Sequence, residues 1–119
     1  MKKLRILIVE DDVVARIALE SVLTDITSVA VIAKRSVAGA SEVLNERFDI
    51  AFIDVSVADG DTFGLASALI AHAVPVVFMG DKSLTLPTAW RSFAFISKPP
   101  RAAAVRQALA QAEEVQLVA

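Results

Sequence analysis

Three acidic side chains and one lysine follow short apolar segments of this sequence. The acids are Glu10, Asp11 and Asp54, and the lysine is Lys98. Carboxylates that share a cleft repel one another, so they must take up protons or hold a cation. Magnesium suits such oxygen ligands, because it keeps several waters and usually binds only one or two carboxylates. An aspartate beside such an ion can act as a nucleophile toward a phosphoryl group, which a lysine binds as a point charge.

A structural explanation competes with this chemical one. The acids from Glu10 to Asp12 could form only a strand-end turn and a helix cap, and Lys98 could be a solvated surface side chain. Each element taken alone favours that explanation. Their recurrence after three separate apolar segments favours a functional site.

The apolar segments have the length of strands that are buried on both faces of a parallel sheet. The expected strands are Leu4 to Val9, Val29 to Ala33, Ile50 to Ile53, Val76 to Met79, and Phe93 to Ile96. Helices are expected from Val13 to Ile26 after an Asp12 cap, from a Ser36 cap to about Arg47, from an Asp61 cap to about Ala73, and from Pro100 to about Leu117. Between Gly80 and Arg91, Pro87 leaves room for only a short helix.

Alternating strands and helices predict a three-layer α/β/α sandwich around a parallel sheet. Right-handed crossovers with helices on both faces require one point where the winding reverses. If the first strand is that point, the first and third strands are neighbours. Their carboxyl ends then bring Glu10, Asp11 and Asp54 together, and Lys98 arrives from the fifth strand.

Composition narrows the class of protein. A chain of 119 residues is expected to form one domain. The absence of cysteine excludes disulfides and thiol catalysis, and the net charge of −2 argues against a nucleic-acid groove. The apolar run after Lys2 and Lys3 is too short for a signal peptide, and no segment reaches membrane-spanning length. We therefore expect a cytoplasmic protein without nucleic-acid or membrane partners.

Four motifs in this order and spacing resemble the receiver domain of bacterial response regulators over essentially the whole chain. They are ILIVEDD (6–12), DIAFIDVSVADGD (49–61), PVVFM (75–79) and FISKPP (95–100). The resemblance implies a doubly wound, five-stranded, flavodoxin-like sheet of order 2-1-3-4-5. It also implies that Asp54 accepts a phosphoryl group from the histidine of a sensor kinase or a phosphotransfer protein.

The same resemblance assigns the remaining site residues. Asp11 and Asp54 would bind Mg²⁺ directly, Glu10 would act through water, and the main-chain carbonyl of Ser56 would complete the metal site. Lys98 would bind the phosphoryl group. Phe95 would be the aromatic side chain that changes rotamer on activation.

The sequence departs from the family pattern at the end of the fourth strand. The family usually has threonine or serine where this chain has Gly80, so the hydroxyl that bonds a phosphoryl oxygen is missing. Ser83 or Thr85 could lend that hydroxyl if the following loop folds back. The segment from Gly80 to Lys98 is also shorter than usual by about one helical turn, so we expect a truncated fourth helix.

These features predict a stand-alone receiver, residues 1–119 without an output domain, that acts as a relay, a phosphate sink or a switch for a downstream protein. Such a chain would be a phosphoacceptor and not an enzyme. The amphipathic last helix could cover the sheet, form a homodimer, or do both. Gly80 also motivates the alternative of a pseudo-receiver that binds partners without phosphorylation. A dehalogenase-type phosphatase is disfavoured because Ser56 stands where its second aspartate belongs, and acids after the first strand disfavour a flavin or nucleotide binder.

Overall fold

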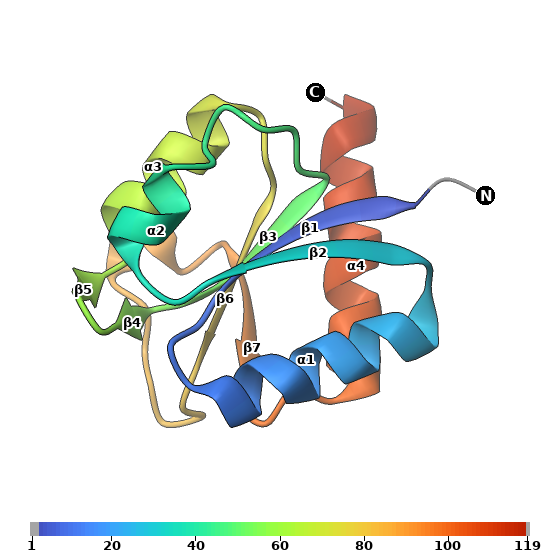
Figure 1. The fold of residues 1–119 in the computed structure, drawn as a ribbon, viewed down its shortest axis with the longest axis horizontal. Helices are drawn as coiled ribbons and strands as arrows, with labels where there is room; N and C mark the ends of the chain where they lie inside the picture. The colour runs from blue at the N-terminus through green and yellow to red at the C-terminus, as the bar shows by residue number, and fades with distance from the viewer. Residues whose placement is uncertain (1–2, 119) are drawn as a thin grey trace.

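Five parallel strands form the centre of the molecule in the order β2-β1-β3-β6-β7 (Figure 1). The computed structural model describes the main chain of residues 3–118 and the side chains of residues 3–112. The strands are β1 (Leu4–Val9), β2 (Val29–Lys34), β3 (Ile50–Asp54), β6 (Val76–Gly80) and β7 (Ala94–Ser97). Since β6 and β7 are the fourth and fifth strands of the sheet along the chain, the predicted flavodoxin-like order is confirmed.

Helices cover both faces of this sheet (Figure 1). They are α1 (Val13–Ile26) and α4 (Ala102–Val118) on one face, and α2 (Val37–Ser41) and α3 (Phe63–Ala71) on the other. Successive side chains of a strand point to opposite faces. In β1, Ile6 and Ile8 therefore pack with the first pair of helices, and Leu7 and Val9 pack with the second pair. The predicted three-layer sandwich is confirmed.

The first two helices begin at the predicted caps. Asp12 Oδ1 accepts hydrogen bonds from the Val14 and Ala15 amides at 2.9 and 3.2 Å. Ser36 Oγ likewise accepts from the Gly39 amide at 2.9 Å.

The second helix is shorter than expected, because α2 ends at Ser41 and not near Arg47. After Gly39 the amides bond three residues back instead of four, as Val43 does to the Ala40 carbonyl at 3.1 Å. Glycine lowers helix propensity, which favours this change to tighter turns.

Two other helix starts differ from the prediction. The N-cap position of α3 is Thr62 and not Asp61, and the Thr62 side chain makes no capping bond, although Asp61 Oδ1 accepts the Phe63 amide at 3.3 Å. The last helix begins at Ala102 and not at Pro100, and the Val105 amide donates to the Arg101 carbonyl at 3.0 Å in its first turn. None of the described helices is long and apolar enough to cross a membrane.

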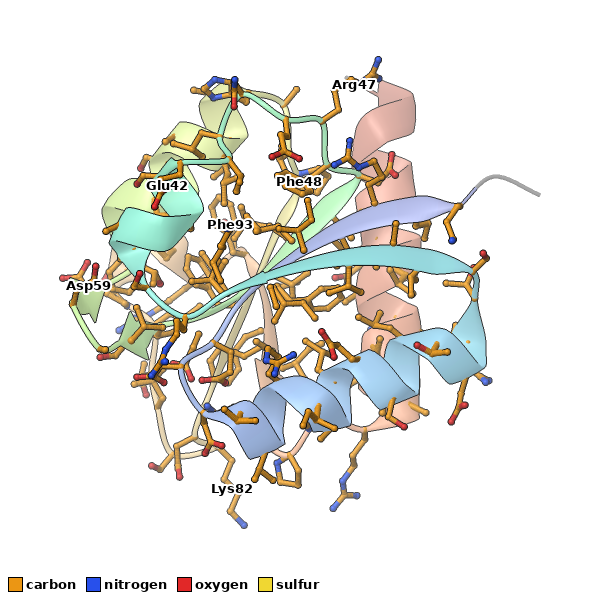
Figure 2. The ribbon with its side chains drawn as sticks, viewed as in Figure 1. Glu42, Arg47, Phe48, Asp59, Lys82 and Phe93 are labelled. Atoms are coloured by element: carbon orange, nitrogen blue, oxygen red, sulfur yellow. The ribbon has the colours of Figure 1, made fainter. Side chains whose placement is uncertain are left out.

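The fourth helix of the predicted fold is reduced to one short turn. Residues 81–93, all of which the structure describes, contain only the 3₁₀ turn η1 (Thr88–Trp90). An aromatic cluster packs here against the sheet. The centroid of the Trp90 ring lies 5.6 Å from that of Phe63, 5.5 Å from that of Phe78 and 5.0 Å from that of Phe93, which is labelled in Figure 2. The expected truncation is confirmed, and Trp90 is a packing residue.

A small antiparallel hairpin follows Asp54. It consists of β4 (Ser56–Val57) and β5 (Gly60–Asp61), and Gly60 has a φ of 130° that favours glycine. Asp59 lies in the turn of this hairpin, beside the start of α2 (Figure 2). Its carboxylate accepts the Val37 and Ala38 amides at 2.8 and 3.0 Å, and these bonds lower the pKa of Asp59. The hairpin is thereby tied to the second helix.

We expect Asp59→Ala to loosen the first turn of α2 without unfolding the domain, because the Val37 and Ala38 amides lose their acceptor. Hydrogen exchange at these two amides should speed up, while amides of β3 stay protected. Asp25→Ala is the matched control, since Asp25 is an exposed acid on α1 that carries the same charge. Unchanged exchange at these amides in Asp59→Ala would show that the two hydrogen bonds from Val37 and Ala38 to Asp59 contribute nothing to the order of α2.

Candidate functional site

The predicted site residues lie at the carboxyl edge of the sheet. Val9 is the register partner of Ile53, so Glu10 and Asp54 stand side by side at the ends of β1 and β3. Lys98 follows β7, two strands away from β3, and its amide donates to the Gly80 carbonyl at 2.9 Å. The long lysine side chain reaches back across the end of β6.

Lys98 bridges the two carboxylates. Its Nζ donates to Glu10 Oε1 at 2.6 Å and also to Asp54 Oδ2. Glu10 is 2% exposed and Asp54 8%, so both acids are largely withdrawn from water. Charged groups are costly to bury unless they are paired and hydrogen-bonded. The ammonium supplies that pairing.

Burial and the neighbouring charges shift the pKa values of Glu10 and Lys98. Burial raises the pKa of Glu10, the hydrogen bond from Lys98 opposes that rise, and the charge of Asp54 adds to it. For Lys98, burial alone would lower the pKa, but the hydrogen bonds and charges of Asp54 and Glu10 outweigh burial and raise it. The lysine is therefore held in its charged form.

Hydrogen bonds also hold Oδ1 and the main-chain carbonyl of Asp54. Asp54 Oδ1 accepts the Ser56 amide at 3.0 Å. Thr62, which is completely buried, donates its hydroxyl to the Asp54 carbonyl at 2.6 Å. The sequence analysis missed Thr62, because a threonine eight residues after an aspartate carries no pattern of its own. Only the fold of the β4–β5 hairpin brings the two together.

A metal ion would find oxygen donors at this edge. Asp11 is half-buried next to Glu10, and the Lys98 ammonium already lies between Glu10 and Asp54, where it shows that the acids hold a cation. Within the described part of the chain, no three His, Cys, Asp or Glu side chains gather as a preformed metal cluster. The donor set fits Mg²⁺, which needs only one or two carboxylates besides water and substrate oxygens.

Gly80 ends β6 beside the site, and two apolar side chains close the space over it. A Cβ atom at this position would lie 3.0 Å from Leu84 Cδ2 and 3.5 Å from the Phe95 ring. Leu84 belongs to the loop before η1, so a neighbouring loop residue fills the volume that a side chain of residue 80 would take. The Phe95 ring lies against Gly80 and is half-buried.

Ser83 does not lend the missing hydroxyl in this structure. Its Oγ donates to Asp81 Oδ1 at 2.7 Å, and its amide bonds the same oxygen at 2.8 Å. These bonds lower the pKa of Asp81 and form the turn that carries Leu84. Thr85 is exposed on the same loop.

Comparison with known proteins places this geometry in a family. No family model and no curated protein matches the sequence. Among solved structures, the signal receiver domain of a modulated diguanylate cyclase from Desulfovibrio desulfuricans G20 has the same fold, with a TM-score of 0.84 and 23% identity over 99% of this chain and 100% of that one. SdrG from Sphingomonas melonis Fr1 is 31% identical over 95% of this chain and 99% of its own, with a TM-score of 0.82. The chain belongs to the response regulator receiver family.

A CheY-like receiver domain from Methylobacillus flagellatus is also similar, with a TM-score of 0.79 and 24% identity over 93% of this chain and 99% of that one. SdrG has also been solved in a BeF₃-activated conformation, which is 31% identical with a TM-score of 0.76 and covers 92% of this receiver and 97% of that chain. The fold and the family predicted from the sequence motifs are both confirmed.

The raised pKa of Glu10 has a testable consequence for stability. From its ordinary value of 4.5 up to the raised value, the folded receiver binds more protons at Glu10 than the unfolded chain does. Stability therefore falls as the pH rises through this window. The Glu10→Gln variant cannot titrate and should lack this decline when urea midpoints are measured against pH. Parallel curves for the two proteins would contradict the prediction.

A second prediction concerns Gly80, which cannot donate a hydrogen bond to a phosphoryl oxygen. Such a bond to a charged group is worth about 1.5 to 3 kcal/mol, and a ligand shifts a two-state equilibrium only through such differential contacts. With beryllofluoride as the phosphoryl mimic, we expect small changes in the Phe95 ring signals by NMR. In Gly80→Thr the changes should be larger, once Leu84 has moved aside.

Gly80→Ala is the matched control, since it also displaces Leu84 but adds no hydroxyl. If beryllofluoride changes the Phe95 ring signals equally in wild type, Gly80→Ala and Gly80→Thr, the absence of a hydroxyl at residue 80 does not limit the response of Phe95. Thr85 would then be the next side chain to test.

Proposed function

We propose that this receiver accepts a phosphoryl group on Asp54 from the phosphohistidine of a sensor kinase or phosphotransfer protein. In this role it is a signalling domain and not an enzyme, and it serves as a relay, a sink or a switch for a downstream protein. The observation that carries the proposal is the Lys98 ammonium, which donates to both Glu10 and Asp54 at the sheet edge. A buried carboxylate with a cation beside it can take up a charged group without leaving new charge unpaired.

The transfer step follows from these contacts. An Asp54 carboxylate oxygen forms a bond to phosphorus, the bond between phosphorus and the imidazole nitrogen breaks, and the bonding pair leaves with the imidazole. The product is an acyl phosphate with one more negative charge than the carboxylate had. Lys98 can pair with this added charge by moving from the carboxylate to a phosphoryl oxygen, because its ammonium already donates to Asp54 Oδ2.

Magnesium is the cofactor that we propose for the same step. Asp11 and Asp54 would hold the ion directly, Glu10 through water, and Ser56 through its main-chain carbonyl. When bound, the ion would neutralise charge shared between the carboxylate and the phosphoryl oxygens. Glu10 is already held by Lys98 and by the Asp12 amide at 3.3 Å, so an outer, water-mediated role is compatible with its contacts.

The donor protein must approach over the edge that carries Asp54. Beside that edge, the first turns of α1 expose apolar side chains: Val13 is 55% exposed, Val14 76% and Ile17 53%. A protein that covers these side chains would gain from burying them and would shield the reacting groups from water. This favours a protein donor over free transfer from a small molecule in the cell.

The test is intact mass after incubation with acetyl phosphate and Mg²⁺. We expect one added phosphoryl group, which base and hydroxylamine remove, as they do with acyl phosphates and not with phosphoserine. Asp54→Asn should abolish the addition, and chelation of Mg²⁺ or the Asp11→Ala variant should slow it by at least tenfold. Asp25→Ala controls for loss of an acidic charge elsewhere.

A mass shift that survives Asp54→Asn would move the site, with Asp11 and Asp12 the next candidates. No mass shift in the wild-type protein, either with acetyl phosphate or with a phosphohistidine donor, would favour the pseudo-receiver that binds partners without phosphorylation. Equal rates with and without Mg²⁺ would remove the metal from the proposal.

A further inference from the structure

Thr62 lies behind Asp54, although it comes eight positions later in the chain. The β4–β5 hairpin turns the chain back, with Ser56 paired to Asp61, so Thr62 comes to stand against Val55. Its side chain is 0% exposed. A buried hydroxyl must find hydrogen-bond partners, and it finds them in the main chain directly after Asp54 rather than in its own helix.

The first peptide unit after Asp54 is held at both ends. Its carbonyl, from Asp54, accepts the Thr62 hydroxyl at 2.6 Å. Its amide, from Val55, donates to the Met79 carbonyl of β6 at 3.0 Å. Because a peptide unit is planar, these opposite bonds define its orientation.

The second peptide unit is held in the same way. The Val55 carbonyl accepts the Thr62 amide at 3.0 Å and lies 3.2 Å from the Thr62 hydroxyl. The amide of this unit belongs to Ser56, and it donates to Asp54 Oδ1 at 3.0 Å. In a planar trans unit the carbonyl and the amide point in opposite directions. Thr62, by holding the carbonyl, aims the Ser56 amide at the Asp54 carboxylate.

We propose that Thr62 is a positioning residue for phosphoryl transfer to Asp54. It orients the two peptide units that follow Asp54, so that the Ser56 amide holds Oδ1 while Lys98 holds Oδ2. The carboxylate is thereby set in one orientation before the phosphoryl donor arrives. This inference rests on the proposed function. Thr62 keeps its own proton throughout, and the new bond forms only between an Asp54 oxygen and phosphorus.

Preorganisation of this kind acts on the rate of the chemical step rather than on binding of the donor. Misplacement of a reacting group by about 1 Å can cost on the order of 100-fold in rate. The Thr62 amide would still hold the Val55 carbonyl without the hydroxyl, so the loss expected from removing the hydroxyl is smaller, on the order of tenfold.

The test compares Thr62→Val, which keeps the shape but removes the hydroxyl, with Thr62→Ser, which keeps the hydroxyl. In the unphosphorylated protein, the Ser56 amide proton of Thr62→Val should shift upfield and exchange faster, because its bond to the carboxylate loosens. With acetyl phosphate and Mg²⁺, the maximal phosphorylation rate of Thr62→Val should fall about tenfold at an unchanged half-saturating concentration. Thr62→Ser should restore both readouts.

Two controls separate positioning from loss of stability. Thr24→Val removes a hydroxyl that donates to the Glu20 carbonyl at 2.8 Å on the exposed side of α1. Val105→Ala weakens the core under α4, where Val105 is 0% exposed and belongs to the hydrophobic cluster on the α1 and α4 face of the sheet. Neither should change the Ser56 amide or the maximal rate.

The outcomes separate this inference from the proposed function. An unchanged Ser56 amide and an unchanged maximal rate in Thr62→Val would overturn the positioning role. A similar fall in rate in Val105→Ala would also overturn it, since the effect would then be one of stability. If the wild-type protein takes up no phosphoryl group, the proposed function fails and the positioning role falls with it.

Discussion

The contact on which this receiver depends is the one that Lys98 makes with Glu10 and Asp54. Two carboxylates cannot be buried side by side at a sheet edge without a cation, because each would raise the cost of ionising the other. The hydrogen bonds from Lys98 lower that cost, and the lysine comes from a strand that is not adjacent to the strand of either acid. The site therefore needs a strand order in which β7 is not adjacent to β1 or β3 but lies close enough for the Lys98 side chain to reach both acids.

The winding of the sheet meets that condition. Since β1 lies between β2 and β3, the direction in which strands are added to the sheet reverses there, and the carboxyl ends of β1, β3, β6 and β7 open onto one edge. The site ends of β1, β3 and β6 are buried on both faces, so packing holds the charged groups that lie at the ends of β1 and β3.

Two parts of this receiver depart from the family pattern next to the site. Where a hydroxyl is usual, Gly80 leaves a hollow that Leu84 fills, and where a helix is usual, the aromatic cluster around Trp90 covers the sheet. In both places an apolar side chain from residues 81–93 packs where the family pattern has a hydroxyl or a helix: Leu84 at Gly80, and Trp90 over the sheet. The Asp54 side of the site is instead reinforced, since the β4–β5 hairpin is held by Thr62 at its base and by Asp59 at its turn. The two sides of Asp54 are thus unequally constrained.

The amino-acid sequence alone determined the layers and singled out Glu10, Asp54 and Lys98, because buried parallel strands leave short apolar runs and a charge at the end of such a run stands out. The strand order was implied by the resemblance of its motifs to the receiver family. The sequence could not place the end of α2, the cap of α3 or the β4–β5 hairpin, since these depend on a few hydrogen bonds that neutral turn residues can make in several ways. Only the tertiary structure showed that Leu84 covers Gly80 and that Thr62 holds the main chain behind Asp54. Such contacts join residues that carry no signal of their own, and they exist only because the folded chain brings them within hydrogen-bonding or van der Waals distance.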